Sequence, residues 1–285
     1  MDLGRVGIWW SGRWASEEEP SLDVPAAMEA LGYGALWCSG GLERGLARRF
    51  GRLLEATGTV AVASGIVSIW TTPPSELAAA VAELDRRSPG RFVLGLGASH
   101  AVLAADYARP WSSMVAYLDG LDAPGGATVP AGRRVLAALG PRMLKLAAER
   151  AAGAHPYLVP VEHTVRARQI LGAGPVLAPE VTAVLESDPT AARAAARGFI
   201  GGYLTLPNYA NNLRSLGFAD SDLAGEGSDR LVDAVVAWGD VGAVAARVRE
   251  HLAAGADHVC VQVVSAMSSF PVAAYRALAP PLLDL

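Results

Sequence analysis

The sequence has little charge and almost no cysteine, and each shortage limits what the protein can be. Only 18% of its 285 residues are charged, and 24 basic and 28 acidic side chains give a net charge of −4. The two signs are interspersed, whereas a nucleic-acid surface normally appears as a basic stripe. Cys38 and Cys260 are the only cysteines, and both lie within apolar runs. They predict buried thiols in a reducing compartment and not a disulfide framework.

Several catalytic and targeting signatures are also missing. The sequence contains no Walker loop and no Gly-x-Ser-x-Gly motif, and its five histidines show neither His-x-His nor His-Glu-x-x-His spacing. These absences argue against a P-loop enzyme, a serine hydrolase and a zinc site, and we predict no metal. The chain begins without a basic and apolar leader, and no uncharged apolar run reaches membrane-spanning length. We therefore expect a soluble, cytoplasmic protein that needs no membrane or nucleic acid.

What the sequence has in abundance is apolar runs separated by helical patterns. Most of these runs are continuous, which is typical of strands buried on both faces of a parallel sheet. Eight strands, each followed by a helix, predict one α/β domain over residues 1–285, a (β/α)₈ TIM barrel. A helical insertion, residues 186–256, separates strands seven and eight. The expected strands are 5–10, 34–38, 58–70, 91–97, 133–139, 155–159, 176–185 and 257–264.

Small residues gather where two of these strands end, at 63–70 and 91–100. Glycine carries no Cβ, so Gly65, Gly95 and Gly97 are expected to let a flat ligand approach the backbone. Gly65 fits equally a bulge that supports a ring and a crowded position where no side chain has room. His100 follows the second run, at the end of a barrel where chemistry occurs, and histidine as a residue type can exchange protons near neutral pH. It is the best acid–base candidate, although a lone histidine at a strand end is more often structural.

A third feature is Gly140-Pro141, which opens a predicted helix. The free amides at its start, with Arg142 and Lys145 nearby, make a workable anion site. An ordinary Gly-Pro turn with solvated charges explains the same residues. Tryptophans also cluster near the predicted strand ends, which is compatible with core packing or with an aromatic-walled pocket. They are Trp9, Trp10, Trp37, Trp70 and Trp111.

Five segments, in this order along the chain, carry a family resemblance: Gly32–Trp37, Ser64–Ser68, Gly90–His100, Ala138–Met143 and Ala254–Val259. With them the sequence resembles the luciferase-like monooxygenase superfamily, and within it the oxidoreductases that depend on the deazaflavin coenzyme F420. Two further stretches, Tyr203–Tyr209 and Trp238–Asp240, resemble one subfamily of that branch.

The resemblance implies roles for particular residues. The Gly65–Ile66 bond is expected to be a non-prolyl cis peptide that backs the deazaflavin ring. His100 stands where relatives often carry a catalytic carboxylate. Where relatives place a polar pair after strand two, this chain has Cys38-Ser-Gly-Gly41. The cofactor-binding residues implied are Gly65, Ile66, Val67 and Ser68 along the ring, Ala98 and Ser99 beside it, and Leu139, Gly140, Pro141, Arg142 and Met143 at the phosphate tail.

The function expected from this resemblance is hydride transfer between reduced F420 and a small organic substrate, by a homodimer. FMN is the alternative cofactor, in a monooxygenase of the same fold. Another alternative is a cofactor-binding protein without catalysis, favoured by Ser39-Gly40-Gly41. A barrel hydrolase or isomerase is least favoured, because carboxylate pairs are missing from the predicted strand ends.

Overall fold

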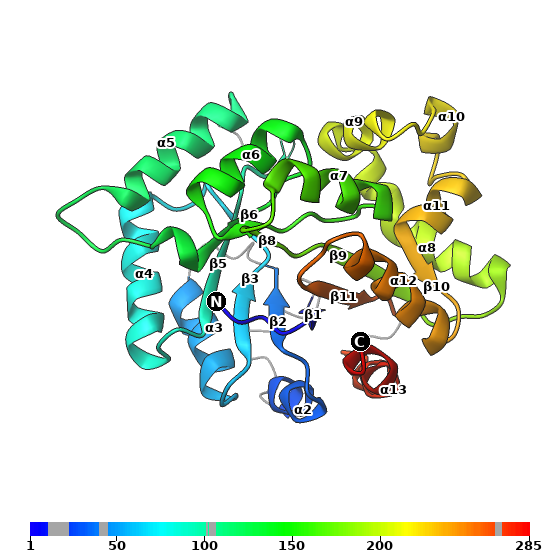
Figure 1. Ribbon diagram of the computed structural model, residues 1–285, viewed down its shortest axis with the longest axis horizontal. Helices are drawn as coiled ribbons and strands as arrows, with labels where there is room; N and C mark the ends of the chain where they lie inside the picture. Colours follow the sequence, from blue (N-terminus) through cyan, green and yellow to red (C-terminus); the bar gives the residue numbers. More distant parts are fainter. Residues whose placement is uncertain (11–22, 40–44, 101, 103–106, 266–269) are drawn as a thin grey trace.

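The computed structural model describes residues 1–10, 23–39, 45–100, 102, 107–265 and 270–285. They form a curled, wholly parallel sheet with helices packed around its outside (Figure 1). The strands are β1 (Val6–Trp10), β2 (Ala35–Cys38), β3 (Ala61–Ser64), β4 (Val67–Ser68), β5 (Phe92–Gly97), β6 (Arg134–Leu136), β7 (Gly153–Ala154), β8 (Val176–Leu177), β9 (Glu180–Val184), β10 (Val236–Trp238) and β11 (Val259–Val263).

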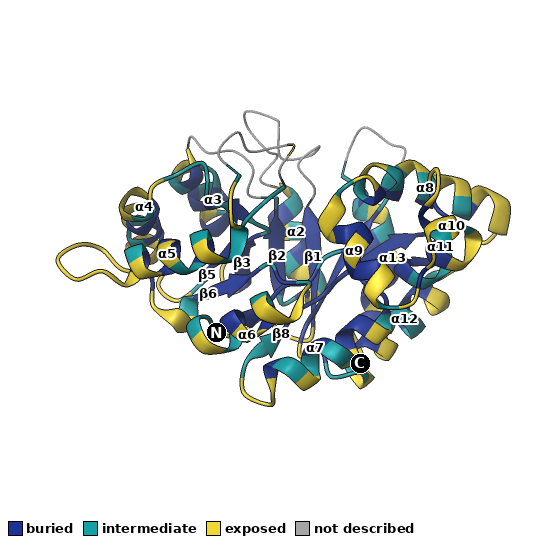
Figure 2. Ribbon diagram, turned by 90° about the horizontal axis from the view of Figure 1, so that it is seen from above, coloured by how far each residue is buried: buried dark blue, intermediate teal, exposed yellow. Residues whose placement is uncertain are grey.

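The outer helices have buried residues on one side and exposed residues on the other (Figure 2). In α3, for example, Phe50, Leu53 and Leu54 are buried, as the helical spacing of apolar residues dictates. The helices are α2 (Asp23–Leu31), α3 (Leu46–Glu55), α4 (Pro74–Arg87), α5 (Pro110–Asp122), the 3₁₀ turn η1 (Ala131–Arg133), α6 (Pro141–Arg150), α7 (Val161–Leu171), α8 (Pro189–Leu204), α9 (Pro207–Ser215), α10 (Asp220–Leu223), α11 (Asp229–Val235), α12 (Val241–Ala253) and α13 (Val272–Leu283).

The strand order is β10-β9-β11-β1-β2-β3-β5-β6-β7-β8. The segment 176–184 bonds to neighbours on both of its sides. The amides of Ala178 and Glu180 donate to the carbonyls of Ala154 and Pro156, and the Cys260 amide donates to the Pro179 carbonyl. The two ends of the curled sheet therefore meet at this segment, and the predicted barrel topology is confirmed. Cys38 and Cys260 are buried and unbridged, as expected.

Three predicted strands differ from the structure. The run 58–70 is broken between β3 and β4, and the run 176–185 is broken at Pro179, which has no amide to donate. The predicted strand 155–159 is wrong, because the strand is Gly153–Ala154 and Leu158 has φ 52°. An additional strand, β10, pairs with β9 inside the region expected to be helical.

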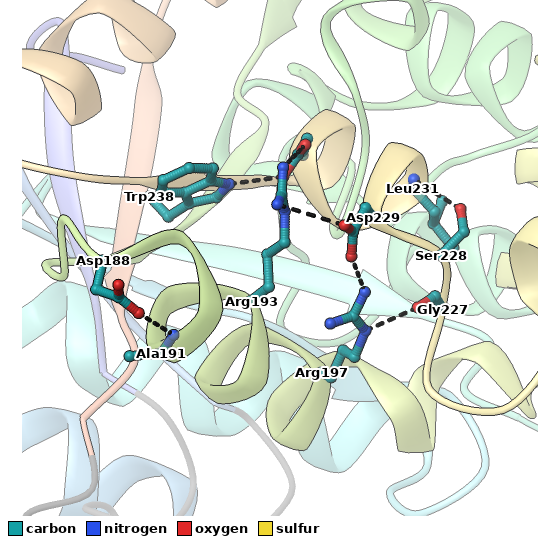
Figure 3. Close-up of polar contacts among 10 residues, drawn as sticks. Asp188, Ala191, Arg193, Arg197, Gly227, Ser228, Asp229, Leu231 and Trp238 are labelled. Carbon is teal, nitrogen blue, oxygen red and sulfur yellow. Dashed lines mark hydrogen bonds and ion pairs between the residues drawn. The ribbon is translucent and has the colours of Figure 1, made fainter.

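The insertion between β9 and β11 contains α8 to α12 and β10. Two of its helices begin at aspartates whose side chains accept from the helix amides, as N-caps do. The Asp188 carboxylate accepts from Ala191 N at 2.8 Å (Figure 3), and the Asp240 carboxylate accepts from Ala243 N at 2.8 Å. Among the described residues, no helix is both long and apolar enough to cross a membrane.

Candidate functional site

A cavity of about 630 Å³ opens at the carboxyl ends of the strands. Its walls come from the ends of β1, β3, β6, β7 and β11 and from the inner faces of α8 and α9. This is the end of a barrel at which ligands bind. The residues that line it are Trp9, Ser39, Gly65, Ile66, Ala137, His155, Tyr157, Ala195, Gly198, Phe199, Tyr203, Tyr209, Gln262, Val263, Val264 and Ser265.

The Gly65–Ile66 peptide forms part of the cavity wall, and it is cis, as the resemblance implied. Its surroundings hold it through several hydrogen bonds. Gly65 N donates to the Cys38 carbonyl at 2.7 Å, and the buried Ser64 hydroxyl donates to the Gly95 carbonyl at 3.1 Å. Gly95 N in turn donates to the Ser64 hydroxyl at 2.9 Å. The turn between β3 and β4 is thereby tied to β5.

The three glycines of this region make room for the protein's own atoms. A Cβ on Gly95 would lie 1.9 Å from the Ser64 carbonyl oxygen, and one on Gly97 would lie 2.4 Å from Cδ1 of Ile66. A Cβ on Gly65 would meet the Trp9 ring at 2.2 Å. On the side where a Cβ would stand, the glycines admit the 64–66 turn and the Trp9 ring. Of the three, Gly65 lines the cavity.

His155 lies in the cavity wall between two indole rings. Its ring stacks on Trp37 at 4.2 Å and on Trp9 at 5.3 Å. Nδ1 lies 2.6 Å from the carbonyl of Ala178, so it carries the proton and leaves Nε2 as an acceptor. Burial lowers the pKa of His155 to about 4, so the ring is neutral at pH 7. Among the described residues, nothing hydrogen-bonds to this buried Nε2.

Three tyrosines and a glutamine form another part of the cavity wall. The Tyr157 hydroxyl donates to Oε1 of Gln262 at 2.8 Å, and the Tyr203 hydroxyl lies 3.3 Å from that of Tyr157. The Tyr209 ring meets the Tyr203 ring edge-on, with centroids 5.5 Å apart. Sequence reasoning placed none of these four residues, nor His155, in the site. The one signal was the Tyr203–Tyr209 stretch within the family resemblance.

The helix that supplies Phe199 and Tyr203 is anchored on its other side by arginines (Figure 3). The Arg193 guanidinium makes two bonds to the Asp233 carboxylate, at 2.9 and 2.6 Å, and Trp238 Nε1 donates to the same carboxylate at 2.8 Å. One turn further on, Arg197 binds the Gly227 carbonyl at 2.9 Å and pairs with Asp229. These contacts hold α8 against α11 and so position one wall of the cavity.

Glu180 lies in the barrel interior and is 1% exposed. Its carboxyl accepts from Leu158 N at 3.2 Å and from the Thr182 hydroxyl at 2.7 Å. Within the described part of the chain it has no ion pair with a basic side chain. Burial raises the pKa of Glu180 to about 7. A carboxyl group that holds its proton near neutrality therefore sits in the core of the barrel.

His100, the predicted acid–base residue, stands outside the cavity lining. Its ring is partly exposed and lies 5.4 Å from the Tyr209 ring, which does line the cavity. Nδ1 is 2.8 Å from Oδ1 of Asn208 on α9. The contact joins the end of β5 to the insertion and places His100 next to Tyr209 of the cavity wall.

Of the predicted cofactor residues, the structure brings Gly65 and Ile66 into the cavity wall. Val67 is buried in the core, and Ser68, Ala98 and Ser99 are partly buried beside it. At the start of α6, Gly140, Pro141 and Arg142 are exposed, whereas Leu139 and Met143 are partly buried. The Arg142 guanidinium lies 4.4 Å from the Trp111 ring. Ser39 lines the cavity, whereas Gly40 and Gly41 lie outside the described residues.

The sequence matches the model of the luciferase-like monooxygenase family over residues 19–119. The structure is similar to an F420-dependent secondary alcohol dehydrogenase solved with an F420-acetone adduct, with a TM-score of 0.75, 14% identity and 98% of each chain covered. The chain has the luciferase-like fold. No curated protein sequence matches it.

Two further structures with this fold bind different cofactors. The F420-dependent tetrahydromethanopterin reductase from Methanopyrus kandleri gives a TM-score of 0.70 at 17% identity over 98% of each chain. The oxygenating constituent of 3,6-diketocamphane monooxygenase from Pseudomonas putida, solved with FMN, gives 0.67 at 12% identity. That comparison covers 100% of this chain and 99% of the other. Both F420-dependent and FMN-dependent proteins thus share the fold.

Proposed function

We propose that this protein is an oxidoreductase that binds coenzyme F420 in the cavity and uses it for hydride transfer with a small organic substrate. The observation that carries the proposal is the cavity itself. It lies at the carboxyl ends of the strands and has the volume of a cofactor site. Its support is the likeness to two F420-dependent enzymes over 98% of the chain.

The residues present fit a planar ring system. Ile66 and Ala137 offer apolar contact on one side of the cavity, and the rings of Trp9 and Tyr157 offer aromatic contact. His155 supports this wall as a neutral ring stacked between Trp9 and Trp37, and its Nε2 is buried within the wall and not open to the ligand.

The tail of the cofactor is assigned to the start of α6, with Gly140, Pro141, Arg142 and Met143 as its binding residues. The first amides of a helix and a nearby guanidinium attract phosphate. Val67, Ser68, Ala98 and Ser99 are assigned to the support of the ring site, because none of them lines the cavity.

The bound deazaflavin supplies the hydride chemistry. The chain's own residues position the ring and exclude water from it. The Nδ1 atom of His100 faces the side-chain oxygen Oδ1 of Asn208, which can only accept a hydrogen bond. The ring proton therefore sits on Nδ1. Nε2 is then the atom at which His100 accepts or returns a proton for the substrate.

FMN-dependent oxygenation is the second candidate. It is favoured by the match to the luciferase-like monooxygenase family and by the likeness to a monooxygenase solved with FMN. The two candidates differ in which cofactor binds and in whether oxygen is consumed.

Titration of the purified protein with F420 and, separately, with FMN tests the proposal through cofactor fluorescence anisotropy. We expect saturable binding of F420 and weaker binding of FMN. Gly198 on α8 lines the cavity and has open space beside it, so Gly198→Phe should obstruct the site without a backbone clash. Gly202→Phe, on the same helix but outside the lining, is the matched control. Binding of neither cofactor, or equal binding by both variants, would contradict the proposal.

We also propose that the protein is a homodimer, by its likeness to the family. Light scattering at micromolar concentration measures this, and a monomeric mass contradicts it.

A further inference from the structure

The cavity wall holds no charged side chain among the described residues. Its only titratable ring with an ordinary pKa near neutrality is His155, and burial keeps that ring neutral. A charged group placed in such a site lacks a partner, and burying an unpaired charge is expensive. The residues of this wall therefore favour the binding of an uncharged group.

One polar group in this wall has a fixed orientation. Gln262 is 4% exposed and projects from β11. Its Oε1 accepts the hydroxyl proton of Tyr157 at 2.8 Å. Because Tyr157 gives its one hydroxyl proton to Gln262, the hydroxyl of Tyr203 must donate in the 3.3 Å contact between the two tyrosines. Tyr203, Tyr157 and Gln262 thus form a chain of hydrogen bonds, called the relay below, and it ends at the amide oxygen of Gln262.

The other end of the Gln262 amide is free to bind a ligand. Its Nε2 carries two N–H donors, and none of the described residues accepts from it. Since Gln262 lines the cavity, a ligand oxygen is the partner that would satisfy these donors.

The surroundings of Gln262 are aromatic. The Tyr157 ring lies 5.3 Å from Trp9 and 5.5 Å from Tyr203, both in tilted contact. Phe199 packs on Tyr203 from α8, also at 5.5 Å. Flat apolar groups bind favourably against such rings.

We infer that Gln262 determines substrate specificity, and that the substrate class is an uncharged aromatic compound whose carbonyl oxygen accepts from Gln262 Nε2. Tyr157 and Tyr203 are positioning residues that hold the amide in the donating orientation. The inference deepens the proposed function and rests on it, because it names what binds beside the cofactor.

The test uses probes that share a benzene ring. Acetophenone carries the carbonyl, ethylbenzene has a methylene in its place, and benzoate and benzylammonium carry opposite charges. Titrations of the purified protein by ligand-observed NMR give each affinity. We expect acetophenone to bind about tenfold more tightly than ethylbenzene, the scale of one buried hydrogen bond, and both ions to bind more weakly.

Two substitutions at Gln262 separate its roles. Gln262→Leu removes both donors, so acetophenone should lose about tenfold in affinity while ethylbenzene is unaffected. Gln262→Glu keeps an oxygen for Tyr157 but replaces the donors with a negative charge. This variant should bind acetophenone more weakly and benzylammonium more tightly than the wild type does.

Tyrosine variants test the relay. Tyr157→Phe frees the amide to rotate and should lower acetophenone affinity about threefold, a fraction of one hydrogen bond. Tyr117→Phe is the matched control, since it removes a buried hydroxyl that donates to the Thr72 carbonyl away from the cavity lining, and acetophenone affinity should stay the same.

Equal affinities for acetophenone and ethylbenzene, or tightest binding of benzoate, would overturn the inference. So would undiminished acetophenone binding by both Gln262 variants with native circular dichroism. F420 titration of the same samples separates the two claims. If F420 binds but acetophenone and ethylbenzene bind equally, only this inference is wrong. If acetophenone binds more tightly than ethylbenzene but F420 does not bind, only the proposed cofactor is wrong.

Discussion

The indole of Trp37 stacks on the imidazole of His155, with ring centroids 4.2 Å apart and planes 14° apart. The same indole donates through Nε1 to Nε2 of His258 at 3.0 Å. One tryptophan therefore contacts two buried histidines in the barrel interior. Both rings are held neutral, because burial lowers the pKa of each to about 4.

We expect the protein to lose stability in mild acid. Burial also lowers the pKa of His251, to about 3. In the unfolded chain the three histidines bind protons as the pH falls below about 6.5, whereas in the folded chain they do not. The free energy of unfolding should fall between pH 6.5 and about 4, by roughly 1.4 kcal/mol per pH unit for each histidine. The raised pKa of Glu180 has the opposite effect, because the folded protein then binds this proton at a higher pH than the unfolded chain does. Over this pH range it offsets the loss of stability caused by one of the three histidines.

Urea denaturation at pH 7, 6 and 5 measures the effect. A free energy of unfolding that stays constant or rises from pH 6.5 to 5 would show that these histidines are not buried in neutral form.

Replacement of Glu180 by glutamine should stabilise the protein at high pH only. The pKa of Glu180 in the folded protein, about 7, lies above the ordinary glutamate value of 4.5. The protonated Glu180 carboxyl contributes fully to the free energy of unfolding below pH 4.5. This contribution is lost as the pH rises through 7. Glutamine mimics the protonated carboxyl, so Glu180→Gln should raise the free energy of unfolding at pH 8 by about 3 kcal/mol and leave it nearly unchanged at pH 4.5.

Denaturation curves at the two pH values test this, with the exposed Glu226→Gln as control. An equal effect of Glu180→Gln at both pH values would mean that the carboxyl does not change its protonation state in this range.

His100 should be needed for turnover and not for cofactor binding. His100→Ala is expected to lower turnover with reduced F420 by about 10²- to 10⁴-fold, the scale of a lost general acid or base. F420 affinity should stay nearly constant, because the ring lies outside the cavity wall. His100→Gln keeps a hydrogen-bonding group toward Asn208 but cannot cycle a proton.

Steady-state rates and F420 titrations of both variants are compared with wild type. Full activity of the glutamine variant would reduce His100 to an orienting role, and full activity of both would remove it from the reaction.

Arg142→Glu should weaken F420 binding without unfolding the protein. Arg142 is exposed and contacts the Trp111 ring, so its replacement disturbs little of the core. Loss of a charged hydrogen bond to phosphate should cost about 1–3 kcal/mol of binding free energy. Affinity is measured by fluorescence titration at constant ionic strength. Arg276→Glu, on an exposed face of α13, makes the same change in net charge and should bind F420 normally. Unchanged affinity of the Arg142 variant would place the tail elsewhere.

The sequence by itself determined the features that depend on neighbours along the chain. Continuous apolar runs are buried on both sides of a parallel sheet, so they predicted most strands to within a few residues. The caps of Asp188 and Asp240 are of this local kind, because an N-cap acts on amides only three residues away. Family resemblance identified the Gly65–Ile66 peptide and thus one wall of the cavity.

Only the tertiary structure decided which residues form the tyrosine and glutamine part of the cavity wall. Tyr157 and Gln262 are 105 residues apart in the sequence, and Tyr203 comes from the insertion. No periodicity brings such residues together, because their meeting depends on how far the sheet curls and where α8 rests on it. The same applies to Gly95 and Gly97, whose neighbours across the sheet are Ser64 and Ile66. A glycine in a sequence shows that space is needed, but tertiary packing decides which atoms fill it.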